Sequence, residues 1–199
     1  MNFTNKFQQQ FSFLQPEDFE AFFRITTKLK FRKGERIIER GDTRKKVFVI
    51  LKGIVRGFIY NYKRRELTTF LHQENEPFMA YEPVVQNKPT NHIFECLEPT
   101  EVLSFDYEEL ITLTEKNANI KKVKDAIITN SLIFALQRNE QFIQESPEKR
   151  YLSFIEHHSD LMQRVSQKHI ASYLGITAVS FSRVKNRIYM QQDTVSDSQ

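Results

Sequence analysis

The sequence has no tryptophan, a single cysteine and only five glycines among its 199 residues. One cysteine, Cys96, cannot form an internal disulfide or supply the four thiolates of an iron–sulfur site. Burial of apolar side chains must therefore hold the fold together, and 18 phenylalanines provide much of that surface. A chain of this length can form one sizeable domain plus a small one, or two small ones, each with its own core, and we expect two domains.

Long apolar runs are also missing. No stretch approaches the roughly 18 to 20 consecutive apolar residues that a membrane span needs. The opening MNFTNKFQQQF lacks the apolar centre of a secretory signal. We therefore expect a cytoplasmic protein that has no membrane partner.

Charge of both signs is present, and the formal net charge of +4 is too small to identify a partner. Its distribution is more informative, because residues 161–192 hold five lysines and arginines and no aspartate or glutamate. A basic stretch is usually just a solvated surface, so charge alone does not predict DNA binding.

The first half of the chain reads as a helix followed by a sheet. Residues 12–30 carry phenylalanines at helical spacing, which predicts an N-terminal helix. From residue 28 to about 105, short runs rich in Val, Ile, Phe, Tyr and Thr alternate with turn residues, a pattern typical of an antiparallel roll or barrel. Residues 74–91, with three prolines, are expected to form a long functional loop. The clearest predicted strands are 47–51, 54–62, 67–71, 92–97 and 102–105.

A long helix is predicted next. Asp106 and Glu109 form a capping box that marks a helix start, and Asn119 is a second candidate N-cap. Residues 120–145 lack glycine and proline, which predicts a helix about 39 Å long at about 1.5 Å per residue. Its apolar residues follow the spacing of a helix-pairing seam, which comprises Ile120, Val123, Ile127 and Phe134. We expect a second copy of the chain to cover this seam; burial against the same chain is the alternative.

The most specific signal is QKHIASYLGITAVSFSRVKNR, residues 167–187, which fits two helices joined at Gly175. It follows a new helix start at Ser146 and Pro147, where we place a domain boundary. Gly175 can adopt the left-handed conformation that ends a helix, because it has no Cβ. The predicted inner faces consist of Ile170, Ala171, Leu174, Phe181, Val184 and Ile188, with Ile176 in the turn. This arrangement predicts a helix-turn-helix.

The opposite side of the second helix holds no acidic residue and suits a DNA major groove. Arg183 can bond guanine, Asn186 can read adenine, and Val179 can touch a thymine methyl. Thr177 can cap the helix, and hydroxyl and basic side chains can contact phosphates. The predicted DNA-binding residues are Ser166, Lys168, Thr177, Val179, Ser180, Ser182, Arg183, Asn186 and Arg187, with Met190 on the same side. An ordinary helical hairpin with a solvated basic face is the alternative.

Together these parts resemble the CRP/FNR family of bacterial regulators over about residues 10–190. Arg32-Lys33-Gly34-Glu35, Gly41-Asp42 and Val47-Phe48-Val49-Ile50-Leu51-Lys52-Gly53 are similar to the start of its cyclic-nucleotide-type β-roll. Arg183 matches the family's base-reading arginine. The resemblance implies a transcription regulator that is not an enzyme. Its implied partners are double-stranded DNA with a near-palindromic operator, a second copy of the chain in a homodimer, and RNA polymerase.

The resemblance also implies an α+β fold in three parts. Residues 1–118 would form an N-terminal antiparallel β-roll, a double-stranded β-helix of jelly-roll type, with its N-terminal helix. Residues 119–145 would form the dimerisation helix, and residues 146–199 a C-terminal helix-turn-helix domain. The family's β-hairpin wing has no counterpart in the eleven residues after Ile188, which are mostly polar. We therefore expect a truncated or missing wing, and a disordered tail over 191–199.

A second departure concerns the effector. Family members that bind cyclic nucleotides carry a Gly-Glu pair and an Arg-Ser pair around the phosphate. Ungapped pairing here puts Ala80 at the Glu, and Thr90 and Asn91 at the Arg and Ser. A cyclic phosphate would lack its countercharge, which argues against cyclic AMP or cyclic GMP as the effector. In a shifted register, Glu82 or Lys88 could substitute.

Two other interpretations stay open. A cupin-like enzyme would need a metal, but its only candidate ligands, His72, Glu74 and His92, lack a tight cluster; we expect no metal and no cofactor. Cys96 is expected to be a buried small hydrophobe rather than a redox sensor. The other interpretation keeps the fold as an effector-binding or protein-interaction module with a decayed DNA reader. The missing wing favours it, whereas Arg183 opposes it.

Overall fold

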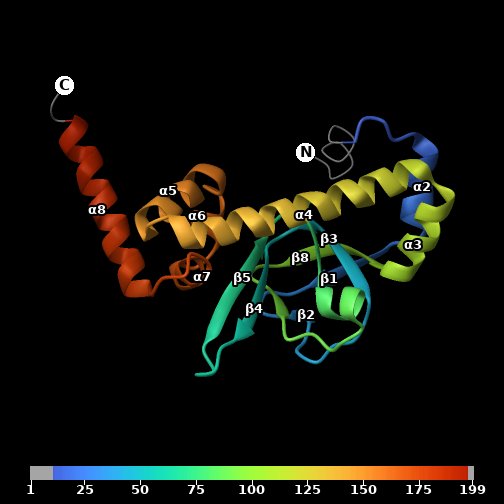
Figure 1. Ribbon diagram of the computed structural model, residues 1–199, viewed down its shortest axis with the longest axis horizontal. Helices are drawn as coiled ribbons and strands as arrows, with labels where there is room; N and C mark the ends of the chain where they lie inside the picture. The colour runs from blue at the N-terminus through green and yellow to red at the C-terminus, as the bar shows by residue number, and fades with distance from the viewer. Residues whose placement is uncertain (1–10, 197–199) are drawn as a thin grey trace. The chain divides into compact units, whose positions relative to one another are not determined.

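Figure 1 shows the computed structural model, which describes residues 11–196 and the side chains of residues 11–188. The chain divides into two compact units. The N-terminal unit consists of Met1–Tyr60 and Thr69–Ser131, and the C-terminal unit consists of Asn61–Thr68 and Leu132–Gln199. The division falls inside the long helix, after Ser131, rather than at either of its ends.

Two four-stranded sheets form the antiparallel β-roll. The first sheet has the order β1-β8-β3-β6, and the second has the order β2-β7-β4-β5. The strands are β1 (Thr27–Phe31), β2 (Arg36–Ile38), β3 (Lys46–Lys52), β4 (Val55–Tyr60), β5 (Glu66–His72), β6 (Pro77–Met79), β7 (Ile93–Cys96) and β8 (Thr100–Asp106). The β1–β8, β2–β7, β3–β6, β3–β8 and β4–β7 pairings are antiparallel. The predicted α+β class and its antiparallel β-roll are therefore confirmed.

Strand β3 shows how one apolar run serves both faces of a sheet. Successive side chains of a strand point to opposite faces. Phe48 and Ile50 accordingly lie in the core cluster between the sheets, while Val47 and Val49 lie in a second buried cluster. A strand with both faces buried needs a cover on its outer side, and helices provide it.

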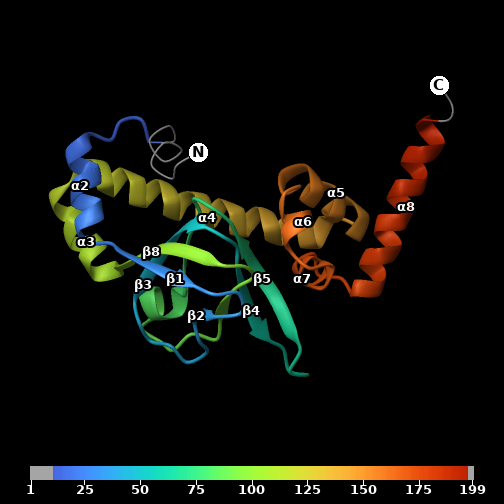
Figure 2. The same cartoon turned by 180° about the vertical axis from the view of Figure 1, so that it is seen from behind.

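Three helices contribute to this second cluster: α2 (Pro16–Arg24), α3 (Tyr107–Lys116) and the first part of α4 (Ala118–Gln144). Figure 2 shows α2 and α3 beside the N-terminal end of α4. The buried carboxylate of Asp18 joins them, since it accepts hydrogen bonds from Asn117 Nδ2 at 2.6 Å and Asn119 Nδ2 at 2.9 Å. Burial acts to raise the pKa of Asp18, but hydrogen bonds from Asn117, the Gln15 backbone and Asn119 outweigh it and lower the pKa.

The predicted N-terminal helix over residues 12–30 is too long. α2 ends at Arg24, and Thr27–Phe31 instead forms β1, which pairs with β8 along its whole length. Leu29 and Phe31 alternate with Lys28 and Lys30, which is the pattern of a strand, so the helix was predicted to extend too far. The apolar side of α2 still packs inward, since Phe22 lies edge-on to Phe105 with ring centroids 5.2 Å apart.

Two helix starts differ in detail from prediction. α3 begins after Asp106 as expected, but that carboxylate makes no capping bond and pairs instead with Lys46 Nζ at 2.8 Å. Asn117 rather than Asn119 caps α4, because its Oδ1 accepts hydrogen bonds from the N–H groups of Asn119 and Ile120, both at 3.0 Å.

The predicted loop over residues 74–91 contains secondary structure. It holds β6 and a short π-helix, η1 (Glu82–Gln86), which ends at Asn87 in the left-handed region with φ of 53°. A three-residue strand and a five-residue helix are too short to produce a periodic pattern, so the prolines dominated the prediction.

The C-terminal unit contains four further helices, α5 (Pro147–His157), α6 (Leu161–Arg164), α7 (Gln167–Tyr173) and α8 (Ala178–Ser196). The predicted N-cap of α5 is confirmed, because Ser146 Oγ accepts from the Lys149 N–H at 3.3 Å. α8 continues through residues 191–196, which were predicted to be disordered; residues 197–199 lie outside the described part. From Ala178 to Ser196 the described chain is helical and forms no strand.

Candidate DNA-binding surface and effector site

The helix-turn-helix of the C-terminal unit has the predicted geometry. Gly175 lies between α7 and α8 with φ of +71°, a conformation that favours glycine. A Cβ at this position would also lie 2.5 Å from Phe142 Cε1. Thr177 caps α8, because its Oγ1 accepts from the Ser180 N–H at 3.1 Å. Ser166 caps α7 through the His169 N–H at 3.4 Å.

The predicted inner faces are buried, which fixes the side of α8 that faces solvent. Ile170 and Phe181 are fully buried, and Val184 is 5% exposed. Phe181 meets Tyr151 of α5 edge-on at 5.2 Å between ring centroids. Ile188 is half-buried. The second helix is therefore held by a packed interface along one side only.

The other side of α8 is open to solvent. Val179 is 62% exposed, and Ser182, Arg183 and Asn186 are exposed as well. Arg183 makes no hydrogen bond or ion pair with any residue that the structure describes. A long cation without an intramolecular partner is available to an external acceptor.

The candidate phosphate contacts differ in their availability. Lys168 is exposed. Arg187 is exposed but already forms an ion pair, with its Nη1 2.8 Å from Glu148 Oε1. Ser166 Oγ accepts a capping bond and keeps its hydroxyl hydrogen for another acceptor. Thr177 Oγ1 also accepts a capping bond, but it lies 3.0 Å from Ser180 Oγ, and either hydroxyl can donate to the other.

The candidate effector residues of the N-terminal unit converge on a buried carboxylate. Glu82 Oε2 accepts from Thr90 Oγ1 at 2.8 Å, and Oε1 accepts from the Asn91 N–H at 3.3 Å. His92 Nδ1 lies 3.0 Å from the same Oε1. Glu82, Thr90 and Ala80 are all buried, whereas Lys88 is exposed. The polar groups at the expected phosphate position therefore bind an anion that the chain itself supplies.

Burial acts to raise the pKa of the Glu82 carboxyl. The hydrogen bonds from Thr90, its own backbone, His92 and Asn91 outweigh burial, so the pKa lies below its ordinary value. Glu82 is thus held as a carboxylate at neutral pH and satisfied where it lies.

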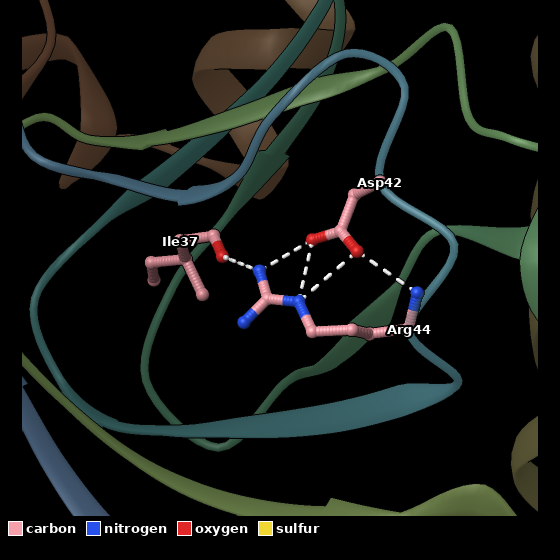
Figure 3. A network of polar contacts seen from close by, with 3 residues as sticks. All are labelled: Ile37, Asp42 and Arg44. Carbon is pink, nitrogen blue, oxygen red and sulfur yellow. Dashed lines mark hydrogen bonds and ion pairs between the residues drawn. The ribbon is translucent and has the colours of Figure 1, made fainter.

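The turn between β2 and β3 forms two backbone hydrogen bonds with Thr90. The Gly41 N–H donates to the Thr90 carbonyl at 2.8 Å, and the Thr90 N–H donates to the Asp42 carbonyl at 3.0 Å. Figure 3 shows how the turn is fixed: the Asp42 carboxylate binds the Arg44 guanidinium, which also reaches the Ile37 carbonyl at 3.4 Å. Hydrogen bonds from the Arg44 side chain lower the pKa of Asp42 below its ordinary range. These bonds fix the backbone of Thr90, and its hydroxyl would have to leave Glu82 to bind a ligand.

Aromatic rings pack beside this carboxylate, a feature that the sequence analysis missed. Phe78 stacks on Phe94 with centroids 5.4 Å apart, and Phe70 stacks on His72 at 5.5 Å. The ring centroids of His92 and Phe94 are 6.1 Å apart. The sequence did contain a signal for this cluster, because residues 70 and 72 are two apart, as are residues 92 and 94. Residues two apart in a strand share one face of the sheet.

A buried ion pair in the roll was missed as well. Arg56 is 1% exposed, and its Nη1 lies 2.7 Å from Glu95 Oε1, directly across β4 and β7. Its guanidinium also stacks 4.3 Å from the Phe58 ring centroid. Nothing in the local sequence distinguishes this arginine from a surface residue.

The predicted dimer seam needs correction. Ile120 and Val123 are 4% and 7% exposed and belong to the buried cluster on the outer face of the first sheet, and Ile127 packs against that cluster. Of the four residues, only Phe134 is exposed. Burial against the same chain, the alternative to dimerisation, therefore accounts for Ile120 and Val123.

A different set of apolar side chains on α4 is exposed. Ile128, Leu132, Leu136 and Ile143 are 45%, 60%, 55% and 75% exposed, and we call them the α4 stripe. At about 100° per residue they span about 80° of the helix circumference. Ile120 and Val123 lie outside this arc, on another side of the helix.

The metal and redox alternatives have little geometric support. His72 Nδ1 lies 3.3 Å from Glu76, His92 faces Glu82, and Glu74 accepts from the Gly53 N–H at 2.8 Å. The described residues contain no group of three or more His, Cys, Asp and Glu placed to hold a metal. Cys96 is 1% exposed, and burial raises the pKa of its thiol to about 11. No helix in the described part of the chain is long and apolar enough to span a membrane.

Comparison with known proteins supports the same architecture. Residues 28–117 match the family model of the cyclic nucleotide-binding domain. No curated protein sequence matches the chain significantly. Among solved structures, FixK2 from Bradyrhizobium japonicum is 17% identical with a TM-score of 0.72, covering 84% of this chain and 86% of its own.

Two further structures are similar. The c-di-GMP-responsive global regulator CLP of Xanthomonas campestris is 14% identical with a TM-score of 0.71, covering 89% of this chain and 93% of its own. The catabolite activator protein of Thermus thermophilus is 18% identical with a TM-score of 0.56, covering 90% of this chain and 85% of its own. Residues 28–117 thus form a cyclic nucleotide-binding-type domain, and the chain has the fold of CRP/FNR-type regulators.

Proposed function

We propose that the chain is a sequence-specific DNA-binding transcription regulator of CRP/FNR type. The observation that carries the proposal is the open side of α8, where Arg183 has no partner among the described residues and no acidic side chain opposes it. A helix buried along one side and open along the other can enter the major groove of DNA without rearranging its support.

The open side divides into base-reading and phosphate-binding groups. Arg183 can donate two hydrogen bonds to guanine, Asn186 can pair with adenine, and Val179 can contact a thymine methyl. Lys168 and the N–H groups at the starts of α7 and α8 suit phosphates. The Arg187–Glu148 pair is exposed and therefore weak, so Arg187 can exchange Glu148 for a phosphate.

We further propose that the α4 stripe pairs with the same stripe of a second copy. An apolar stripe along one side of a helix is complementary to itself about a two-fold axis. Asn139 lies within the arc of the stripe, and a buried polar residue in a helix pair fixes register. The two helix-turn-helix motifs related by this axis would bind a near-palindromic operator.

The N-terminal unit is proposed not to respond to cyclic AMP or cyclic GMP. A cyclic phosphate entering beside Thr90 would meet the Glu82 carboxylate, which already binds Thr90, Asn91 and His92. Two anions would then compete for the same hydrogen-bond donors.

Selection of bound duplexes from a random DNA pool with the purified full chain tests this function. We expect enrichment of a motif with two half-sites about 34 Å, or one helical turn, apart. The Arg183→Ala variant, selected in parallel, should lose preference at one base pair in each half-site. Failure of the wild-type chain to enrich any sequence would favour an effector-binding or protein-interaction module with a decayed reader.

A further inference from the structure

The C-terminal unit contains a cavity of about 420 Å³ that none of the functions above uses. It is formed by the second part of α4, by α5 and by the end of α7. Its volume falls within the range of small-molecule sites, which are lined mainly by apolar and aromatic groups with a few polar ones. The residues that carry its chemistry are Arg138, Arg150, Phe142, Phe154, Tyr173 and Ser153.

Two guanidinium groups line this cavity without a carboxylate partner. Arg138 Nη2 donates to the Tyr173 carbonyl at 2.7 Å. Arg150 Nε donates to the Leu174 carbonyl at 3.1 Å, and its Nη1 donates to the Glu145 carbonyl at 2.6 Å. Neither arginine forms an ion pair with any residue that the structure describes, and the cavity lining includes no aspartate or glutamate.

These carbonyl bonds leave donors unused, because a guanidinium has five N–H groups. Carbonyls at helix C-termini carry only a partial negative charge, and Glu148 acts on Arg150 electrostatically without forming an ion pair, so the two cations are compensated incompletely. Burial lowers the pKa of Arg138, and the nearby Arg150 charge acts in the same direction. An anion in the cavity would relieve both effects.

Aromatic rings provide flat surfaces beside the cations. The Arg138 guanidinium lies 3.8 Å from the Tyr173 ring centroid and 5.0 Å from that of Phe142. Arg150 also lies 5.0 Å from the Phe142 centroid. The cavity therefore combines two hydrogen-bonding cations with faces on which a planar group can stack.

We propose that this cavity binds a small aromatic anion, that is, a ring system carrying a phosphate or carboxylate group. The oxyanion would bind the free N–H groups of Arg138 and Arg150, and the ring would lie against the aromatic side chains. The cavity residues of α4 lie on a different side of that helix from the α4 stripe, so pairing through the stripe would leave the cavity open.

Calorimetric titration of the full chain with 1-naphthyl phosphate tests the proposal without DNA. Inorganic phosphate, which lacks the ring, and 1-naphthol, which lacks the charge, are the controls. We expect 1-naphthyl phosphate to bind more than about tenfold more tightly than either control, because one charge-assisted hydrogen bond accounts for that ratio. Absence of 1-naphthyl phosphate binding at millimolar concentration would overturn the proposal.

Variants locate the binding. Arg138→Gln and Arg150→Gln should each weaken 1-naphthyl phosphate binding by about tenfold or more and leave 1-naphthol unchanged. Lys149→Gln, which removes an exposed charge of α5 outside the cavity, should change nothing. If an arginine variant fails to fold, Ser153→Phe still fills the cavity while keeping both cations and should abolish binding. Binding that is insensitive to Ser153→Phe would place the ligand elsewhere and contradict the proposal.

Phe142 connects the cavity with the helix-turn-helix, because it lines the cavity and also lies against Gly175 of that motif. A ligand there would touch the turn that orients α8. This regulatory consequence depends on the proposed DNA binding, whereas the titration does not, so the two can fail separately.

Discussion

In the N-terminal unit, buried charges are matched by partners of the same unit, whereas in the C-terminal unit three arginines form no ion pair with any described residue. Glu82 is bound by Thr90, Asn91 and His92, and Arg56 is paired with Glu95. Arg138, Arg150 and Arg183 of the C-terminal unit make no such pair. A satisfied charge stabilises a fold, while an unsatisfied one is available to an external partner. We therefore propose that recognition of external partners belongs to the C-terminal unit.

The largest effect is expected from a charge placed in the α4 stripe. Leu132→Asp would put a carboxylate into the proposed helix pair, and uncompensated buried charges cost about 3 to 5 kcal/mol. We expect the dimer to dissociate in sedimentation velocity at micromolar concentration. Asn130→Asp adds the same charge on another side of α4 and should leave the dimer intact. If Leu132→Asp sediments like the wild type, the stripe is not the interface.

A smaller effect is expected at Glu82 in the N-terminal unit. Glu82→Gln removes the charge that Thr90, Asn91 and His92 bind, and hydrogen bonds to a charged group contribute roughly 1.5 to 3 kcal/mol each. We expect the free energy of unfolding at pH 7 to fall by about 2 kcal/mol. Glu115→Gln, at an exposed position, is the matched control. Urea denaturation monitored by circular dichroism measures both variants.

The stability that Glu82 contributes should also depend on pH. The pKa of Glu82 is lower in the folded than in the unfolded chain, so the carboxylate stabilises the fold above its unfolded-state pKa. That contribution is lost as the pH falls through the folded-state pKa. The wild type should therefore lose more stability than Glu82→Gln between pH 6 and the acid range. Parallel pH profiles for the two proteins would show that Glu82 is not held as a satisfied carboxylate.

No effect at all is expected from cyclic nucleotides on the N-terminal unit. A ligand at 100 times its dissociation constant adds about 2.7 kcal/mol of stability. Thermal melts with millimolar cyclic AMP or cyclic GMP should show no such shift, because Glu82 already occupies the donors beside Thr90. A shift that disappears in Lys88→Ala would show that Lys88 supplies the missing countercharge, and the prediction would then be wrong.

The helix-turn-helix was predictable from sequence because its determinants are local. The left-handed turn at Gly175, the cap at Thr177 and the buried side chains of Phe181 and Val184 lie within ten residues. The fold class of the N-terminal unit was predictable as well, since alternation and turn residues mark strands wherever they pair.

Features that depend on distant partners were not predictable. Periodicity showed that Ile120 and Val123 share a side of α4, but not that the outer face of the first sheet covers them. The alternation of Leu29 and Phe31 with lysines is too short to fix the end of α2, and this strand is defined by its pairing with β8. The contacts of Glu82 were not predictable for a different reason: its partners follow only eight to ten residues later, but the residues between them show no repeating pattern.

Base reading by Arg183 can be tested directly with one binding measurement. Arg183→Ala and Lys168→Ala are titrated against the selected duplex and against the same duplex with one base pair exchanged at the position of contact. We predict that Arg183→Ala costs about 1 to 3 kcal/mol on the selected duplex and little on the exchanged one, while Lys168→Ala weakens both equally. Equal losses on both duplexes for both variants would show that Arg183 only contacts phosphate, and would contradict the claim.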